Sequence, residues 1–174
     1  IWIGTRANGL FMYRDGIFTH FTDEEGIPGS SIRFIMEVKD GSIWFGTRNG
    51  ISVYDGQNFK AIQEKDGLPF NQVFSFFQDD QERIWMAFYG GGIGCYMNGR
   101  FYQATLKNGL STDILYMVIE DDLGNIWYSS NVGISMVKKQ DLLYFFEGKI
   151  DSVESRTFDE SDGMKFAECN GGSQ

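Results

Sequence analysis

Four tryptophans at a nearly constant interval are the feature that most limits what this chain can fold into. Trp2, Trp44, Trp85 and Trp127 are separated by 42, 41 and 42 residues. A fixed period of about 20–50 residues marks proteins built from copies of one structural unit, in which each copy buries its apolar surface against its neighbours. The chain of 174 residues therefore reads as four successive copies of one unit.

The residues around each tryptophan recur in the same order. An acidic turn precedes three of them, and a glycine–aliphatic pair follows each after a short strand. The acidic turns cover residues 39–43, 79–84 and 121–126, and the pairs are 9–10, 50–51, 92–93 and 133–134. Three dipeptides then predict tight hairpin turns with positive φ angles: Asp15-Gly16, Asp55-Gly56 and Asn98-Gly99.

Each copy accommodates four short strands, here called a, b, c and d in chain order. They are typified by residues 73–77 (a), 84–87 (b), 51–54 (c) and 59–62 (d). Abundant Phe, Tyr and Gly suit pleated strands joined by turns. Four strands in a period of about 40–45 residues predict an all-β fold made of β-propeller blades, each a sheet of four antiparallel strands. A β-sandwich is the alternative all-β fold, but it does not require one motif to recur at a fixed interval, so the repeat favours the propeller.

The predicted organisation is about four blades in an incomplete ring. Blade 1 contributes only strands b–d, and blades 2 to 4 are fuller. The predicted bounds are 1–25 for blade 1, 26–66 for blade 2, 67–108 for blade 3 and 109–162 for blade 4, and residues 163–174 begin a next blade. The chain begins without Met inside an apolar run, so we expect it to be part of a longer protein. The remaining blades of that protein, or a second copy of the chain in a homodimer, would complete the ring.

Blade 4 is longer than the others because of an insert at residues 138–148. The insert predicts a short helix near 139–147 that ends at Gly148. Leu142, Leu143, Phe145 and Phe146 would bury one face of it. Such a helix either docks a partner or covers the edge of its blade.

The repeat resembles that of the two-component regulator propeller family. The resemblance rests on Ile43–Ile51 and on Tyr54-Asp55-Gly56, and extends to the tail at 162–174. It implies a bacterial sensor domain in the periplasm or elsewhere outside the cytoplasmic membrane. In the family this domain precedes a membrane helix and a histidine kinase or other output domain, and it recognises small molecules, often glycans. Ala87, residues 88–91 and residues 129–131 depart from the family pattern.

Antiparallel pairing places the loops between strands b and c, and those between d and the next a, at one rim of each blade. Ligands often bind where loops from a rigid scaffold converge. The predicted ligand-binding residues are Arg6, Asn8, Arg48, Asn49, Asn71, Gln72, Tyr89 and Asn131. The d–a loops also offer Ser30, Ser31, Thr112 and Asp113.

Rings, amides and guanidinium groups suit a glycan, and Arg6 and Arg48 also suit a carboxylate or a phosphate. The alternative is that the Asn residues serve turn geometry and that the Arg side chains pair with neighbouring carboxylates.

Composition argues against several other classes of function. The net charge of −9 disfavours nucleic acid as a partner. Cys95, Cys169 and His20 form no metal-ligand spacing, so no metal or other cofactor is expected, although a disulfide between the cysteines stays open. No apolar run reaches the length of about 18 residues that a membrane helix needs.

Catalysis has weak support. His20 lies in an outer strand, away from any predicted nucleophile. Carboxylates end strand a in several copies, at the rim opposite the predicted site: Glu37, Asp79, Glu120 and Asp121. Asp122–Trp127 resembles the Asp-box hairpin of sialidase propellers, which is a folding element there. We therefore expect a non-catalytic, ligand-sensing module; the alternatives are a scaffold that binds a protein, and a propeller glycoside hydrolase or lyase.

Overall fold

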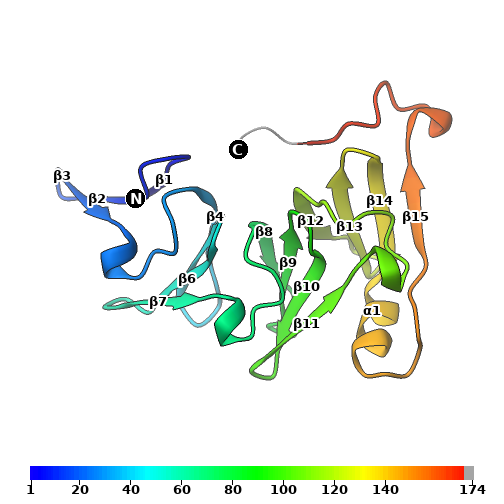
Figure 1. Ribbon diagram of the computed structural model, residues 1–174, viewed down its shortest axis with the longest axis horizontal. Helices are drawn as coiled ribbons and strands as arrows, with labels where there is room; N and C mark the ends of the chain where they lie inside the picture. Colours follow the sequence, from blue (N-terminus) through cyan, green and yellow to red (C-terminus); the bar gives the residue numbers. More distant parts are fainter. Residues whose placement is uncertain (171–174) are drawn as a thin grey trace. The chain divides into compact units, whose positions relative to one another are not determined.

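Short antiparallel sheets, each continuous in sequence, make up the computed structural model, which describes residues 1–170 (Figure 1). These residues form one three-stranded and three four-stranded sheets. Blade 1 contains β1 (Trp2–Gly4), β2 (Leu10–Arg14) and β3 (Ile17–Phe21). Blade 2 contains β4 (Ile32–Glu37), β5 (Ile43–Thr47), β6 (Gly50–Tyr54) and β7 (Phe59–Ile62).

Blades 3 and 4 repeat the four-stranded order. Blade 3 contains β8 (Val73–Gln78), β9 (Ile84–Phe88), β10 (Gly92–Met97) and β11 (Arg100–Ala104). Blade 4 contains β12 (Met117–Glu120), β13 (Asn125–Ser130), β14 (Gly133–Lys138) and β15 (Ser155–Phe158). Every sheet keeps its strands in chain order, which confirms the predicted fold class. Each sheet lies within one predicted segment, while the segment boundaries stay predictions; residues 171–174 lie outside the described part.

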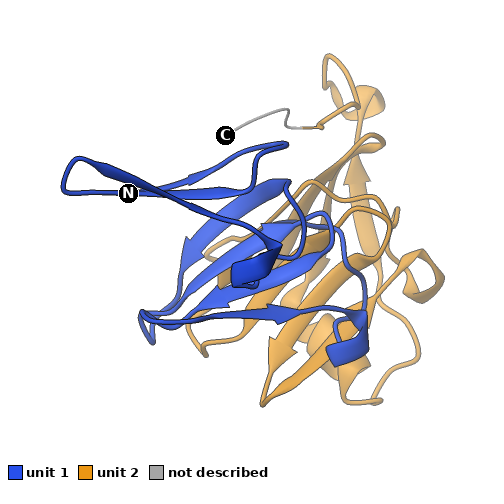
Figure 2. Ribbon diagram, turned by 60° about the vertical axis from the view of Figure 1, so that its left-hand side comes forward, with its two compact units in different colours: residues 1–75 blue, residues 76–174 orange. Residues whose placement is uncertain are grey.

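The chain divides into two compact units, residues 1–75 and 76–174, with the division inside β8 (Figure 2). Within the first unit, Trp2 of blade 1 packs edge-on against Phe45 and Tyr54 of blade 2, with ring centroids 5.2 Å apart in both pairs. Leu10, Phe45 and neighbouring side chains form a buried cluster there. Aromatic and aliphatic side chains thus fill the space between adjacent blades, as the repeat requires.

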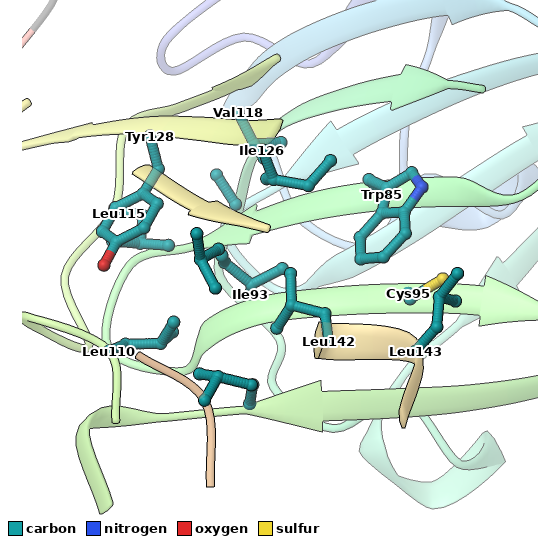
Figure 3. Close-up of a cluster of buried hydrophobic side chains, with 14 residues drawn as sticks. Trp85, Ile93, Cys95, Leu110, Leu115, Val118, Ile126, Tyr128, Leu142 and Leu143 are labelled. Atoms are coloured by element: carbon teal, nitrogen blue, oxygen red, sulfur yellow. The ribbon is translucent and has the colours of Figure 1, made fainter. Parts of the chain in front are cut away.

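The second unit has a larger core that joins blade 3, blade 4 and the helix (Figure 3). Trp85, Ile93, Ile126 and Leu142 are all fully buried in it. The helix α1 (Lys139–Phe146) follows β14 directly. Its Phe146 ring lies 5.4 Å from the ring of Tyr102, in the outer strand β11.

The helix agrees with the sequence prediction in position, in termination and in buried face. Leu142 and Leu143 are buried, and Phe145 and Phe146 are partly buried against the same cluster. Gly148 adopts a φ of 71°, and its amide donates to the carbonyl oxygen of Phe145 over 3.0 Å. The helix therefore packs into the core of blades 3 and 4, and the two roles that the sequence left open for it stay predictions. No helix among residues 1–170 is long and apolar enough to cross a membrane.

One of the three predicted tight turns differs from the prediction. Asp15-Gly16 and Asn98-Gly99 have positive φ at both positions, as a two-residue hairpin requires. At Asp55-Gly56 only the glycine does, and the loop extends over residues 55–58. The Asp55 carboxylate accepts the amides of Gln57 and Asn58 over 2.8 and 2.7 Å, which stabilises a longer side-chain-capped turn.

Candidate ligand-binding rim

Loops of blades 1 and 2 meet at one rim of the first unit and are tied together by hydrogen bonds. The amide of Gly9 donates to the carbonyl oxygen of Ser30 over 2.8 Å, which joins the β1–β2 loop to the β3–β4 loop. On the other side, the buried hydroxyl of Thr47 donates to the carbonyl oxygen of Pro28 over 2.6 Å. Gly29 also lies so close to Asn49 that a Cβ would stand 2.7 Å from its Nδ2. The loops at this rim are therefore held in place by hydrogen bonds and close packing.

A cavity of about 650 Å³ opens at this rim beside the β1–β2 loop. Its lining residues come from that loop, from β2 and β3, and from the β3–β4 loop: Ala7, Asn8, Gly9, Phe11, His20, Thr22, Asp23, Gly29 and Ser30. The volume falls in the range of small-molecule sites, about 300–1,000 Å³. The cavity combines an aromatic wall with hydroxyl, amide and imidazole groups.

The position of His20 explains the aromatic wall. Its ring stacks on Phe11 at a centroid distance of 4.4 Å and an interplanar angle of 10°. Its Nε2 lies 2.7 Å from the carbonyl oxygen of Asn8, which ties the outer strand β3 to the β1–β2 loop. Sequence reasoning placed His20 in strand d but did not bring it to the predicted rim. The Phe11–His20 strand pairing is what does so, and register is not visible in the motif.

The predicted ligand-binding residues of the first unit have different surroundings. Arg6, Asn8, Arg48 and Asn49 are exposed on the β1–β2 and β5–β6 loops. Asn71 and Gln72 follow β7 in the next loop. The Asn71 carboxamide oxygen accepts the amide of Glu64 over 3.0 Å, so this side chain already has a part in the folding of its own loop.

The two predicted residues of the second unit lie in the loops of blades 3 and 4. Tyr89 follows β9, is 37% exposed, and contacts the ring of Tyr116 edge-on at 5.8 Å. Asn131 is exposed in the turn between β13 and β14. The assignment of ligand contacts to all eight residues stays a prediction.

Arg33 is the candidate that sequence reasoning missed. It lies at the start of β4, and its guanidinium carbon stands 5.0 Å from the centre of the Phe74 ring. Burial, together with the positive charges of Arg6 and Arg48, lowers the pKa of the Arg33 guanidinium. The available signal was a cation inside the otherwise apolar run of residues 32–36, where an unpaired charge is costly.

The acidic residues at the opposite rim have structural partners. Asp79, which is buried, accepts hydrogen bonds from the Trp85 indole over 2.9 Å and from the Arg83 Nε over 2.6 Å. Burial alone would raise the pKa of this carboxyl, but those donors hold it below its usual value. The Glu120 carboxylate forms an ion pair with Lys139.

Asp121 has the same role in blade 4. Its carboxylate accepts the Trp127 indole over 2.7 Å and the amides of Leu123 and Asn125 over 2.9 Å, and hydrogen bonds led by that of Trp127 strongly lower its pKa. The bond-making aspartate of the Asp-box-like hairpin is therefore Asp121, where the motif indicated Asp122. The residue six positions before the tryptophan is the one whose carboxylate reaches the indole.

The acidic hollow at this rim has a volume of about 620 Å³ and is lined by the ends of β8 and β12 and by the turns that follow them, with Asp79 and Glu120 among the lining residues. No group of three or more His, Cys, Asp or Glu side chains within residues 1–170 is arranged to hold a metal ion. Cys95 and Cys169 are both free thiols. Burial, with the charge of Asp79 adding to it, raises the pKa of Cys95 to about 12.

Comparison with known proteins finds similarity to proteins of two-component systems. The model of the family described as "Two component regulator propeller" matches residues 26–49 and 67–90. A histidine kinase P4 of Formosa agariphila is 23% identical over 185 residues, which cover 95% of this chain and 13% of that protein.

Two solved structures illustrate the range of proteins with this fold. The extracellular domain of the putative hybrid two component system BT3049 from B. thetaiotaomicron superposes with a TM-score of 0.72 at 25% identity, over 96% of this chain and 22% of the other. Virginiamycin B lyase from Staphylococcus aureus gives a TM-score of 0.60 at 15% identity, over 90% of this chain and 51% of the other, and shares the fold alone. The chain spans less than a quarter of the kinase and of the BT3049 domain.

Proposed function

We propose that this chain, whose residues 26–49 and 67–90 are two-component regulator propeller repeats, is part of a ligand-sensing propeller of a two-component sensor. The module binds a small molecule without transforming it, and the ligand class that suits it best is a glycan. The histidine kinase and the extracellular hybrid-system domain among its relatives support a role outside the cytoplasmic membrane, upstream of a signalling domain.

The observation that carries this proposal is the cavity at the rim of the first unit. Phe11 and His20 bring two aromatic rings to its lining, and aromatic rings suit the apolar face of a pyranose ring. Asn8 and Ser30 supply an amide and a hydroxyl group around it, which match the donors and acceptors of sugar hydroxyls, while the Thr22 hydroxyl is already bonded to Glu25 and to the amide of Glu24. One small molecule placed there would contact loops of two successive blades. Its binding could therefore change how these two loops are positioned relative to each other.

The least favoured alternative, a propeller glycoside hydrolase or lyase, has less support. A glycosidase needs one carboxyl group with a raised pKa and a second that stays ionised. At the acidic rim, donor groups lower the pKa values of both Asp79 and Asp121. The likeness to virginiamycin B lyase supports the fold only, at 15% identity.

A thermal-shift screen on the full-length protein tests the proposal. The panel contains neutral and acidic mono- and oligosaccharides together with common metabolites, and a binding sugar is expected to raise the melting temperature. Ala7→Trp places a bulky ring in the cavity wall and is expected to abolish that rise. Thr19→Trp, at an exposed position on β3 that does not line the cavity, is the matched control and is expected to keep it.

Two results would contradict the proposal. The first is a melting temperature that no member of the panel changes. The second is a sugar-dependent rise of equal size in wild type and Ala7→Trp, which would move the binding site away from this cavity. Consumption of a panel sugar, followed by chromatography, would favour the enzymatic alternative instead.

A further inference from the structure

Three arginines gather at the start of β4 in the first unit. Backbone hydrogen bonds hold the two flanking loops on either side of Arg33. The amide of Ile32 donates to the carbonyl oxygen of Thr5 over 2.8 Å, which fixes the loop that carries Arg6. The amide of Arg48 donates to the carbonyl oxygen of Ser31 over 3.2 Å. Main-chain hydrogen bonds therefore hold the three residues that carry these cations close together.

A β-bulge accounts for the position of Arg33 within this group. Ile32 pairs with Thr47 and Phe34 pairs with Gly46, so the register shifts between them and Arg33 has no partner residue on β5. Such a bulge turns a side chain away from the regular alternation of the strand, and bulges are enriched next to binding sites. The Arg33 guanidinium packs over the face of the Phe74 ring in a cation–π contact.

This cluster has no counter-charge of its own. Among residues 1–170, none of the ion pairs involves Arg6, Arg33 or Arg48. The acidic chain, with 24 Asp and Glu side chains, nevertheless offers many carboxylates. Like charges placed together without a carboxylate destabilise a protein unless something else neutralises them.

Two buried polar atoms at the same place also have no partner. Within the described residues, the buried side-chain nitrogen and oxygen atoms without a hydrogen bond are the Arg33 Nε and the Ser31 Oγ. The Ser31 side chain belongs to a residue that is only 7% exposed. An unsatisfied buried donor is costly, and both atoms here are able to donate to an anion.

We propose that Arg6, Arg33 and Arg48, together with the Ser31 hydroxyl, form a binding site for the anionic group of a small ligand, a carboxylate or a sulfate. The inference rests on the proposed ligand-sensing function and names the chemistry of the ligand. Guanidinium groups bind such planar or tetrahedral oxyanions through paired N–H donors. Ala7 and Ser30, the chain neighbours of Arg6 and Ser31, line the cavity described above, so an acidic sugar is the ligand that suits both features.

Calorimetric titration of the full-length protein tests this site with three probes. Glucuronate carries a carboxylate on a pyranose ring, glucose is its neutral counterpart, and inorganic sulfate is an anion without a ring. We expect glucuronate to bind at least about tenfold more tightly than glucose, since charge-assisted hydrogen bonds are the stronger kind. Sulfate is expected to compete with glucuronate, and the affinity for glucuronate is expected to fall as sodium chloride is raised.

Substitutions locate the binding. Arg33→Gln and Arg48→Gln each remove one charge and are expected to weaken glucuronate binding at least about tenfold. Arg14→Gln is the matched control, because Arg14 is exposed at the end of β2 next to a hairpin turn at the other rim, and it is expected to bind as wild type does. Arg48 is exposed, so Arg48→Gln tests the site without altering a buried side-chain atom.

The outcomes separate this inference from the function on which it rests. Equal binding of glucose and glucuronate, with unchanged affinity in Arg33→Gln and Arg48→Gln, would overturn the anion site and leave the ligand-sensing function in place. Glucuronate binding that is equally weakened by Arg14→Gln would also overturn it, because the effect would then be one of net charge. Failure of the two anions to bind, together with a panel in which no compound binds, would overturn both.

Discussion

Replacing Asp79 by alanine tests whether the acidic turn of blade 3 is a folding element. The buried carboxylate accepts hydrogen bonds from the amides of Gln81 and Arg83, both over 3.0 Å, from the Arg83 Nε over 2.6 Å, and from the Trp85 indole over 2.9 Å. Lys139 adds a more distant positive charge at 3.9 Å. Alanine removes the acceptor for all of these donors at once.

The loss of unfolding free energy depends on whether each donor that loses its acceptor can be hydrated by water instead. The Trp85 side chain is fully buried, so its indole N–H loses its partner without gaining water, at about 1–3 kcal/mol. The Arg83 side chain is 18% exposed and regains some hydration, which reduces its share to about 1 kcal/mol. The two turn amides add about 0.5 kcal/mol each. We expect a total loss of about 3–5 kcal/mol, the range for removing one partner of a buried charged pair.

Native-state hydrogen exchange on the full-length protein measures this loss locally, as the opening free energy of the β9 amides. Asp40→Ala is the control, because the exposed Asp40 carboxylate accepts the amide of Ser42 at the matching turn of blade 2, and it is expected to change exchange little. A loss below about 1 kcal/mol in Asp79→Ala would refute the reasoning.

The pH dependence of the same difference gives a second check. The pKa of Asp79 is lowered in the folded state, so the carboxylate contributes stability above its unfolded pKa of about 4 and loses it as the pH falls through the folded value. The wild type is therefore expected to approach Asp79→Ala in stability below about pH 4. A difference that stays constant down to pH 2 would contradict the assigned role of the carboxylate.

Three further predictions concern other parts of the molecule. Arg33→Gln is expected to raise the melting temperature of the ligand-free protein, because it removes one of three clustered cations and a buried unpaired donor; a fall would contradict the account of that cluster. Peptide mapping after iodoacetamide treatment at pH 8 is expected to find Cys169 modified well before Cys95, whose pKa of about 12 keeps it as a buried thiol, and equal rates would disprove this. Leu142→Ala is expected to lower the exchange-derived stability of β14 by about 2–5 kcal/mol, and Tyr144→Ala, at a position 39% exposed, by much less; similar losses would show that the helix is not anchored as described.

The blades, their strand order and the helical insert were predictable because each signal occurs in several copies or has a strong local pattern. One tryptophan or one glycine–aliphatic pair is weak, but copies in phase require the same local structure each time. The helix has adjacent apolar pairs, Leu142-Leu143 and Phe145-Phe146, that place one continuous face against the core. Local chemistry alone decides such features.

Other features depend on pairing across strands and could not be read from the motifs. The bulge at Arg33 arises from the β4–β5 register, and the approach of His20 to Asn8 arises from the β2–β3 register. The choice of Asp121 over Asp122 depends on which carboxylate reaches the indole of Trp127 after the turn has closed. Strand pairing or turn closure decides each of these, and the repeat pattern predicts only the approximate position.

The measurement that tests the central claim most directly is a crystal structure of the full-length protein grown with glucuronate. The account predicts that the carboxylate lies within hydrogen-bonding distance of the guanidinium groups of Arg33 and of Arg6 or Arg48, with the sugar ring directed toward the cavity. Glucuronate bound at another place, with the three arginines contacting only water, would contradict it.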